Sequence, residues 1–386
     1  MPHQKQQQAV PDPRAAIIVC LDFGDDDYEE RVAEVVRLVE SAGVTRHRVI
    51  GGRRSRPDPK YYAGHGKVEE IGRAAAELNA GYVVFNHEMS PAQQRNVEKE
   101  LDVRTLERTE LILEIFAQRA QTSEGKLQVE LARLEHLSTR LVRGWTHLER
   151  QRGGFGRTGG PGETQLELDR RYIAAKVKTL KGKLAQLQRQ RTVQRRARSR
   201  GEVLSVSIVG YTNAGKSTLF NALTNAKAYE ADQLFATLDT TTRRIWLPPA
   251  NPVVLSDTVG FIRDLPHTLV AAFRATLEET VRADLLLHVV DASSPARDDQ
   301  AADVNKVLAE IGADQTPQIV VWNKIDSAAP QGKLRPAVER DQYGRISRVY
   351  VSARTGAGLD ELRGAIAEFG VARNAERYPA KASISF

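Results

Sequence analysis

Residues 203–218 read Val-Leu-Ser-Val-Ser-Ile-Val-Gly-Tyr-Thr-Asn-Ala-Gly-Lys-Ser-Thr. The first seven residues are typical of a buried strand, and Gly210 to Ser217 match the phosphate-binding pattern G-x-x-x-x-G-K-[ST]. The glycines let the backbone curl so that successive N–H groups face a phosphate, and the helix that follows adds positive potential. We expect Lys216 to bridge the β- and γ-phosphates of a nucleotide and Ser217 to ligate Mg²⁺.

Two further motifs stand at the ends of predicted strands. Val253 to Gly260 ends in D-x-x-G, so Asp257 is expected to hold Mg²⁺ through water and the N–H of Gly260 to sense the γ-phosphate. Ile319 to Asp326 ends in N-K-x-D. The Asp326 carboxylate can accept hydrogen bonds from N1 and N2 of guanine, and adenine offers no such donor pair, which predicts GTP rather than ATP.

The remaining elements complete a nucleotide-binding domain. Asn323 is expected to brace the loops, the Lys324 stem to cover the base, and Ser352-Ala353-Arg354 to present a backbone N–H to guanine O6. The apolar strands, at 203–209, 253–255, 285–290, 319–322 and 349–351, alternate with helical patterns. This order predicts an α/β fold, a P-loop GTPase domain with a doubly wound, mostly parallel sheet.

Two positions in this domain leave alternatives open. Between the first two motifs, one threonine should cap Mg²⁺ and the γ-phosphate, and Thr237, Thr240, Thr241 and Thr242 are all candidates. The residue after Gly260 is Phe261, where many GTPases place a water-orienting glutamine. Phenylalanine cannot orient water by hydrogen bonding, which predicts slow hydrolysis that an external partner completes. The alternative is substitution by another residue, such as Asp264 or His267.

The first third of the chain predicts a separate, small α/β domain. Strands are expected at 15–21 and 82–85, and helices at 28–42, 67–78 and 109–119. Ser90 followed by Pro91 has the form of an N-cap with proline at the first helical position. Alternating strands and helices are typical of an α/β unit.

The middle of the chain carries two heptad series. Leu127, Leu134, Leu141 and Leu148 are spaced by seven, as are Leu166, Ile173, Leu180 and Leu187. Between them, residues 152–162 contain six glycines and a proline, so we expect no helix there. The pattern predicts an antiparallel helical hairpin, and two core helices of a bundle are the alternative.

Basic residues are concentrated in the second arm of this hairpin. Of the 56 Lys and Arg residues in the 386-residue chain, 12 lie between Arg170 and Arg200, where no Asp or Glu occurs. The 49 acidic residues therefore outnumber the basic residues elsewhere, although the net charge is +7. An ordinary solvated helix face mixes signs because like charges repel, so this arm predicts contact with nucleic-acid phosphates.

Composition narrows the class of protein further. The single cysteine, Cys20, excludes a disulfide framework and a multi-cysteine zinc site. No apolar run approaches the roughly 20 residues of a membrane span. Residues 1–13 are rich in Gln and Pro and lack the apolar core of a secretory signal, so a cytoplasmic location is expected.

These motifs together resemble the HflX-type, ribosome-associated GTPases of the Obg–HflX group. The resemblance extends from about residue 15 to 370. Its most specific marks are residues 90–96 (Ser-Pro-Ala-Gln-Gln-Arg-Asn), 110–120, 125–131 (Gly-Lys-Leu-Gln-Val-Glu-Leu) and 160–166 (Gly-Pro-Gly-Glu-Thr-Gln-Leu). The family also has a hydrophobic residue at the position of Phe261. Its pattern makes Phe235 to Leu238 the first switch, which assigns the Mg²⁺ threonine to Thr237.

The resemblance implies specific partners. Proteins of this family bind the large ribosomal subunit, which stimulates their GTPase activity. Their hairpin docks on ribosomal RNA with its glycine loop directed toward the peptidyl transferase centre, and some members split stalled or idle ribosomes after heat stress. The resemblance implies a cytoplasmic monomer, with a fraction of the protein associated with the membrane.

Two other functions are alternatives to ribosome splitting. An assembly or hibernation factor would dock on ribosomal RNA without separating the subunits. An ATP-driven RNA-remodelling enzyme would use the N-terminal domain. Gly64 to Lys67 is too short for a phosphate loop and no second Walker motif is found, which disfavours the ATP-driven enzyme.

Three features depart from the family pattern. The glycine loop, 153–162, is one residue longer, which leaves the position of its tip open. The extra C-terminal domain of longer members is expected to be short or absent. Thr240 stands where proline is usual.

The expected domain boundaries are 1–122 for the N-terminal domain, 123–200 for the hairpin, 201–370 for the GTPase domain and 371–386 for a short tail. Lys216, Thr237 and Gly260 are expected to act in catalysis. Ser217 and Thr237 are the expected direct Mg²⁺ ligands, with Asp257 acting through water. The residues expected to contact GTP or GDP are Gly210, Tyr211, Thr212, Asn213, Ala214, Gly215, Lys216, Ser217, Thr218, Phe235, Ala236, Thr237, Leu238, Asp239, Asp257, Thr258, Val259, Gly260, Asn323, Lys324, Ile325, Asp326, Ser352, Ala353 and Arg354.

Overall fold

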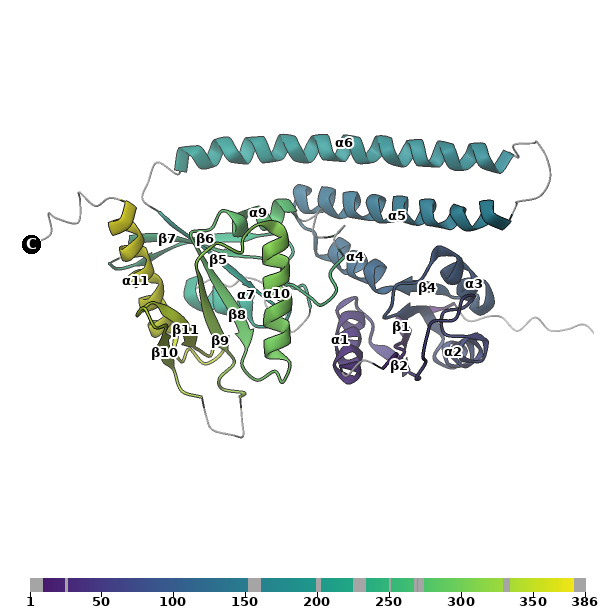
Figure 1. Ribbon diagram of the computed structural model, residues 1–386, viewed down its shortest axis with the longest axis horizontal. Coiled ribbons are helices and arrows are strands. Elements are labelled where there is room, and N and C mark those ends of the chain that lie inside the picture. The colour runs from purple at the N-terminus through teal and green to yellow at the C-terminus, as the bar shows by residue number, and fades with distance from the viewer. Residues whose placement is uncertain are drawn as a thin grey trace, which may run out of the picture. The chain divides into compact units, whose positions relative to one another are not determined.

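The computed structural model describes residues 10–24, 27–151, 161–198, 203–224, 234–249, 251–266, 269, 274–328 and 334–377. The chain divides into two compact units (Figure 1). One unit comprises residues 1–118 and 129–181, and the other comprises 119–128 and 182–386. The predicted hairpin segment is thus shared between the two units.

The first unit contains a four-stranded parallel sheet in the order β2-β1-β3-β4. The two strands and the helices predicted here are present, together with two strands that were not predicted. The strands are β1 (Asp12–Val19), β2 (Arg46–Ile50), β3 (Ala80–Phe85) and β4 (Arg104–Glu107). The helices are α1 (Tyr28–Ser41), α2 (His65–Leu78), α3 (Pro91–Leu101) and α4 (Arg108–Arg119).

The core of this sheet explains which strands the sequence predicted. Ile17 and Val19 of β1 pack with Val68 and Ile71 of α2, and all four side chains are fully buried. By contrast, β2 is mostly exposed and reads Arg-His-Arg-Val-Ile, so it lacks the apolar run of a buried strand. Pairing with β1 rather than its own composition places β2 in the sheet.

The predicted start of α3 is confirmed. The Ser90 hydroxyl accepts a hydrogen bond from the Gln93 N–H at 3.2 Å, and the Gln93 side chain accepts one from the Ser90 N–H at 2.9 Å. Pro91 occupies the first helical turn, where its missing N–H is not needed. This reciprocal capping begins the helix at the predicted residue.

The hairpin helices form as α5 (Ser123–Gln151) and α6 (Pro161–Arg198). Ile173 and Leu180 of the second heptad series are buried, as expected for core positions. Within the first unit, Glu130 and Glu135 of α5 form ion pairs with Lys176 and Lys181 of α6, at 3.7 and 2.8 Å. The expectation that residues 152–162 contain no helix was wrong at its end, because proline suits a first helical position and α6 begins at Pro161. Residues 152–160 lie outside the described residues.

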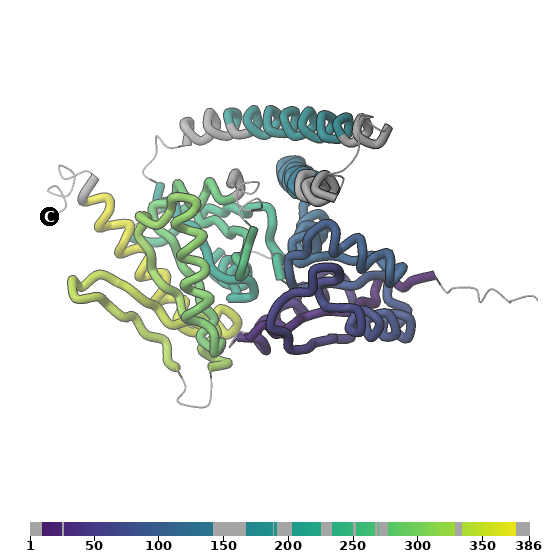
Figure 2. Tube along the Cα trace, turned by 45° about the vertical axis from the view of Figure 1, so that its right-hand side comes forward, coloured from purple at the N-terminus to yellow at the C-terminus, as the bar shows by residue number. Residues whose placement is uncertain are grey.

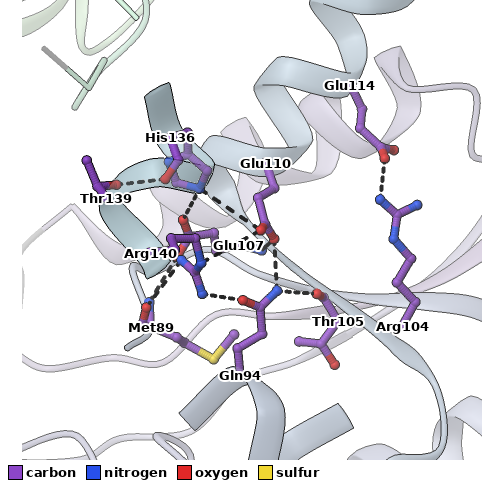
Figure 3. A network of polar contacts seen from close by, with 10 residues as sticks. All are labelled: Met89, Gln94, Arg104, Thr105, Glu107, Glu110, Glu114, His136, Thr139 and Arg140. Carbon is purple, nitrogen blue, oxygen red and sulfur yellow. Dashed lines mark hydrogen bonds and ion pairs between the residues drawn. The ribbon is translucent and has the colours of Figure 1, made fainter. Parts of the chain in front are cut away.

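A buried polar network joins α5 to the first unit's sheet (Figure 3). Glu107, at the end of β4, is only 2% exposed. One of its oxygens lies 3.0 Å from Nε2 of His136, and the other lies 2.7 Å from a guanidinium nitrogen of Arg140. Arg140 also bonds to Gln94 of α3, whose amide donates to the Thr105 carbonyl at 2.7 Å. Burial raises the pKa of Glu107, but His136 and Arg140 outweigh it, and the pKa is lowered.

The second unit contains a seven-stranded sheet in the order β10-β11-β9-β8-β5-β7-β6. It is parallel except for β6 and β10, which pair antiparallel with β7 and β11. The strands are β5 (Leu204–Gly210), β6 (Thr241–Leu247), β7 (Asn251–Asp257), β8 (Leu285–Asp291), β9 (Gln318–Asn323), β10 (Ala337–Arg340) and β11 (Ile346–Tyr350). The helices are α7 (Lys216–Thr224), α9 (Arg274–Val281), α10 (Arg297–Ile311) and α11 (Leu359–Arg377).

Helices cover both faces of this sheet (Figure 1, Figure 2). Helices α7 and α11 contact one another, and between them they contact β5, β6, β7, β10 and β11. Helices α9 and α10 also contact one another, and they contact β5 and β8. The arrangement confirms the predicted doubly wound α/β fold.

The predicted tail was wrong at its start, because α11 continues through Arg377; residues 378–386 lie outside the described residues. Residues 371–377 favour a helix by composition but lack the apolar periodicity that would have predicted one.

Across the described ranges, none of the helices combines the length and apolar character that crossing a membrane requires. The single cysteine, Cys20, is free and buried.

Candidate nucleotide-binding site

The predicted phosphate loop connects β5 to α7, which begins at Lys216. Gly210 and Gly215 have φ values of +149° and +90°, which side chains rarely adopt. A Cβ on Gly215 would lie 2.3 Å from Nδ2 of Asn323, and one on Gly210 would lie 2.3 Å from the Val289 carbonyl oxygen. The two glycines are therefore required by backbone conformation and by close approach of neighbouring strand ends.

Lys216 lies at the start of α7 with its side chain buried. Its ammonium group donates to the Tyr211 carbonyl at 2.7 Å. Burial lowers the pKa of Lys216 to about 8, an effect that nearby Asp257 opposes and Lys324 reinforces. A buried ammonium group of this kind has much to gain from an anionic ligand, because a nearby negative charge compensates for its lost hydration.

Three oxygen atoms from separate elements converge beside Lys216. The Ser217 hydroxyl lies 2.8 Å from the Thr237 hydroxyl, and Oδ2 of Asp257 accepts hydrogen bonds from both, at 2.7 and 2.9 Å. Burial raises the pKa of Asp257, although these hydrogen bonds and Lys216 act against the rise. The other oxygen, Oδ1, is buried and accepts no hydrogen bond from the described residues. Such a cluster of hydroxyl and carboxylate oxygens is the donor chemistry that Mg²⁺ prefers.

The phosphate loop, residues 235–237 and the start of the loop after β7 line one pocket. Gly260 lies so close to the loop that a Cβ would be 2.9 Å from Nζ of Lys216. Its N–H group can therefore approach the same ligand as the lysine. The residues that line the pocket are Thr212, Asn213, Gly215, Lys216, Ser217, Thr218, Phe235, Ala236, Thr237, Thr258 and Gly260.

Phe261 contributes backbone rather than side chain to this region. Its N–H donates to the Gly210 carbonyl at 3.1 Å, and its carbonyl accepts from the Thr212 N–H at 2.7 Å. The ring is 1% exposed, so it belongs to the core. Asp264 is exposed, and His267 lies outside the described residues. Among the described residues that line the pocket, none is a Gln, Glu, Asp or His.

The predicted guanine-binding loops are joined by hydrogen bonds. Asn323 donates to the Ala214 carbonyl and accepts from the Ala353 N–H, both at 2.9 Å, so it connects the phosphate loop to the last loop. The Ser352 hydroxyl donates to Asp326 at 2.6 Å, which lowers the pKa of that carboxyl. Asp326 therefore presents an ionised, exposed carboxylate at the end of the site.

Some predicted contact residues do not point into the pocket. The side chains of Leu238, Val259 and Ile325 are buried in the core, so only their backbones are available there. Asp239 bonds instead to the chain before α5, with its carboxylate accepting from the N–H groups of Gln121 and Thr122. Its proposed contact with nucleotide therefore has no support in the geometry.

One residue that sequence reasoning missed is Asp291, at the end of β8. Its carboxylate lies 2.7 Å from Nζ of Lys324, which orients the lysine stem. The signal was present in the sequence, because Asp291 directly follows an apolar strand and carboxyl ends of parallel strands form the binding edge of such sheets.

A phosphate loop between a strand and a helix, a strand ending in aspartate and an Asn-Lys-x-Asp loop, all on one mostly parallel sheet, define a P-loop GTPase. Family models support this class along the chain. Residues 205–324 match a model described as 50S ribosome-binding GTPase, 29–117 match GTP-binding GTPase N-terminal, and 119–198 match GTP-binding GTPase Middle Region.

Curated relatives identify the family. GTPase HflX of Escherichia coli is 52% identical over 92% of this chain and 82% of its own length. GTPase HflX of Magnetococcus marinus is 49% identical over 87% of this chain and 77% of its own length. A crystal structure of SsGBP with GDP is 25% identical with a TM-score of 0.52, covering 92% of this chain and 98% of that one. The chain belongs to the HflX family of GTPases, and it is a GTP-binding GTP hydrolase.

Proposed function

We propose that this GTPase binds the large ribosomal subunit through α5 and α6, hydrolyses GTP there and separates the subunits of stalled or idle ribosomes in the cytoplasm. The observation that carries the proposal is the exposed basic part of α6 from Arg170 onward, which contains no Asp or Glu. The match of residues 205–324 to a family described as 50S ribosome-binding GTPase supports the same partner.

Helix α6 separates its apolar and basic residues. Ile173, Leu180 and Leu184 form a buried stripe. Lys176 and Lys181 are partly neutralised by acidic residues of α5, but no ion pair involves Lys178 or Lys183 in the part of the chain that the structure describes. Unpaired cations along one helix suit a row of phosphates. The exposed basic residues are Arg170, Arg171, Lys176, Lys178, Lys181, Lys183 and Arg189.

The same helix exposes apolar surface beside these charges. Tyr172 is 63% exposed and Leu168, one turn away, is 56% exposed. Unpaired bases of RNA stack on exposed aromatic rings, whereas a helix that only contacts water has no use for them. The combination of charge with an exposed ring favours RNA over an acidic protein surface.

In the nucleotide site, we assign phosphate binding to the backbone N–H groups of the loop, to Lys216 and to the N–H of Gly260. Ser217 and Thr237 would hold Mg²⁺ directly and Asp257 through water, consistent with their convergence and with the unpartnered Oδ1 of Asp257. The ion neutralises charge on the β- and γ-phosphates when it is bound. Asp326 selects guanine with its ionised carboxylate.

Hydrolysis by the isolated chain is expected to be slow. Phe261 is buried, and none of the described residues that line the pocket is a Gln, Glu, Asp or His that could act on the attacking water. Completion of the site by the large subunit would restrict hydrolysis to the bound protein. GTP then favours the bound form, and hydrolysis releases it.

The direct test measures GTP hydrolysis with and without purified large subunits and, in parallel, sediments intact ribosomes with the protein and a non-hydrolysable GTP analogue. We expect faster turnover with large subunits and conversion of idle ribosomes into separate subunits. Equal rates would refute stimulation. Stimulated hydrolysis with intact ribosomes would favour the alternative, an assembly or hibernation factor that docks without separating subunits.

Substitutions on α6 test the docking surface. Lys178→Gln with Lys183→Gln should weaken large-subunit binding and reduce the salt slope by about one per lost phosphate contact. Arg335→Gln with Arg345→Gln, exposed residues of the second unit, is the control with equal net charge. Equal effects of both pairs would mean that net charge, not α6, governs binding.

A further inference from the structure

The segment 235–239, here called the switch segment, carries two polar side chains with different partners. The Thr237 hydroxyl belongs to the oxygen cluster of the nucleotide site, with Ser217 and Asp257. Asp239, two residues further, bonds to residues immediately before α5. The switch segment therefore connects the nucleotide site to the beginning of the first hairpin helix, and all of these contacts lie within the second unit.

The Asp239 carboxylate makes three contacts at this helix start. Oδ2 accepts hydrogen bonds from the N–H groups of Gln121 at 2.8 Å and Thr122 at 3.0 Å. Oδ1 accepts one from the Thr122 hydroxyl. That hydroxyl in turn accepts from the Gly125 N–H at 3.0 Å, which is the geometry of an N-cap. Asp239 thereby satisfies donors that α5 cannot satisfy itself, and its negative charge suits a helix N-terminus.

Gly125 makes room for these contacts. A Cβ at this position would lie 2.3 Å from Oδ1 of Asp239 and 3.2 Å from the Thr122 hydroxyl oxygen. Glycine in a first helical turn disfavours the helix itself, because it loses more conformational freedom than alanine on folding. Its presence here is explained by the close approach of Asp239.

We propose that Asp239 is a positioning residue: it links Thr237 to α5, so that closing the switch segment on Mg²⁺ and GTP and capping α5 through Asp239 favour one another. Two residues of chain span at most about 7 Å. Hydrogen bonds to Asp239 require donor distances near 2.7–3.2 Å, so a shift of Thr237 by a few ångströms breaks them. The proposal rests on the assignment of Thr237 to Mg²⁺.

Linkage makes the coupling reciprocal. If GTP strengthens the contacts of Asp239, those contacts strengthen the binding of GTP by the same factor. GDP lacks the γ-phosphate that draws Thr237 into place, so its affinity is independent of Asp239. A residue that only caps α5 would change the stability of the protein and leave the ratio of GTP-analogue to GDP affinity unchanged.

The test measures dissociation constants of the full chain for a non-hydrolysable GTP analogue and for GDP, both with Mg²⁺. Asp239→Asn preserves size but replaces an accepting oxygen with an NH₂ group. We expect the affinity for the analogue to fall about fivefold or more and the affinity for GDP to stay within about twofold. Equal losses for both nucleotides, or no loss, would overturn the proposal.

Gly125→Ala tests the same contact from the helix side. Alanine favours the helix, so a selective loss of analogue affinity in this variant arises from excluding Asp239 and not from weakening α5. Asp360→Asn, in the first turn of α11, is the matched control, because its side chain is 95% exposed and, among the described residues, forms an ion pair with Arg363 alone. It should leave both affinities unchanged.

Thr237→Ala separates this proposal from the one on which it rests. Unchanged preference for the analogue in Thr237→Ala would contradict the Mg²⁺ assignment. Lost preference in Thr237→Ala but not in Asp239→Asn would contradict the link to α5. Amide hydrogen exchange of residues 121–128 measures the same coupling at the start of α5. Exchange there should be about fivefold slower with the analogue than with GDP, and Asp239→Asn should abolish this difference.

Discussion

Helix α5 is held at two places by contacts of different kinds. At its start, Thr122 and Asp239 form hydrogen bonds that are partly exposed to solvent. More than three turns further along α5, the side chains of His136 and Arg140 contact Glu107, whose carboxylate is almost completely buried (Figure 3). The first set belongs to the second unit and to the switch segment, and the other set belongs to the sheet of the first unit.

The difference indicates which contact can change during the GTPase cycle. A solvent-exposed hydrogen bond exchanges with water at little net cost, so it can open and close in response to a ligand. A buried carboxylate deprived of its cations would remain unpaired away from water, which is strongly unfavourable. The Glu107 network therefore holds α5 throughout the cycle, and the Asp239 contact reports the nucleotide.

The largest expected effect comes from breaking the ion pair between Arg140 and the buried Glu107. Arg140→Ala leaves the buried Glu107 carboxylate without its guanidinium partner and should lower the free energy of unfolding by about 3–5 kcal/mol. Chemical denaturation monitored by circular dichroism measures this. The ratio of GTP-analogue to GDP affinity should remain that of the unaltered protein.

A matched surface pair provides the control. Arg48 and Glu77 lie 2.6 Å apart with side chains 49% and 62% exposed, so Arg48→Ala should cost less than about 1 kcal/mol. Similar losses at Arg140 and Arg48 would show that burial does not distinguish the Glu107 network. A changed nucleotide preference in Arg140→Ala would remove the contrast between the two contacts of α5.

The next effect falls on activity. Lys216→Met removes the cation beside the phosphates, and loss of one such group lowers the rate by roughly 10²–10³-fold. Burial lowers the pKa of Lys216 to about 8, so the lysine keeps its charge at neutral pH but holds its proton less tightly in the folded protein than in the unfolded chain, which costs folding free energy. The variant should therefore be at least as stable as the original protein without nucleotide.

Lys216 is thus the opposite of Arg140, since one is buried for function and the other for structure. Single-turnover hydrolysis and thermal unfolding, measured on the same preparation, check both statements. A strongly destabilised Lys216→Met protein would mean that this lysine also supports the fold.

A smaller effect is expected at the guanine end. Asp326→Ala removes the carboxylate that we propose accepts two hydrogen bonds from the base. One charge-assisted hydrogen bond is typically worth about 1.5–3 kcal/mol, so the loss of even one of them lowers affinity by at least about tenfold. The loss should be equal for GTP and GDP, because both carry guanine. Titration with both nucleotides checks this, and it provides the non-selective pattern against which Asp239→Asn is compared.

The contacts that could be predicted from sequence are those made by neighbouring residues. The loop from Gly210 to Ser217 and the Asn323–Asp326 loop were predictable because phosphate and guanine binding demand particular residue types at short, fixed spacings. The helix pair α5 and α6 was predictable because heptads repeat locally.

Other features depend on contacts between distant parts of the chain. Asp239 and Thr122 are separated by 117 positions, and neither belongs to a repeating pattern. Strand β6 begins at Thr241, within a polar segment that reads as a loop, and is placed by antiparallel pairing with β7. Glu107 at the end of a four-residue strand gives no sign that it will be buried by a helix 30 residues later.

A change of pH distinguishes the two contacts without any substitution. The pKa of Lys216 is about 8 in the free protein, and phosphates favour its charged form. Above pH 8, binding of GTP requires uptake of a proton, so its affinity should fall by up to about tenfold per pH unit. In the Glu107 network, the Glu107 carboxyl has a lowered pKa and therefore keeps its charge in this range. Between pH 7.5 and 9.5, GTP-analogue affinity should therefore fall while the stability supplied by the network stays constant.

Isothermal titration in buffers of different ionisation enthalpy would detect the proton uptake directly. Affinity independent of pH, with no proton uptake, would show that Lys216 stays fully charged in the free protein and that burial does not tune it.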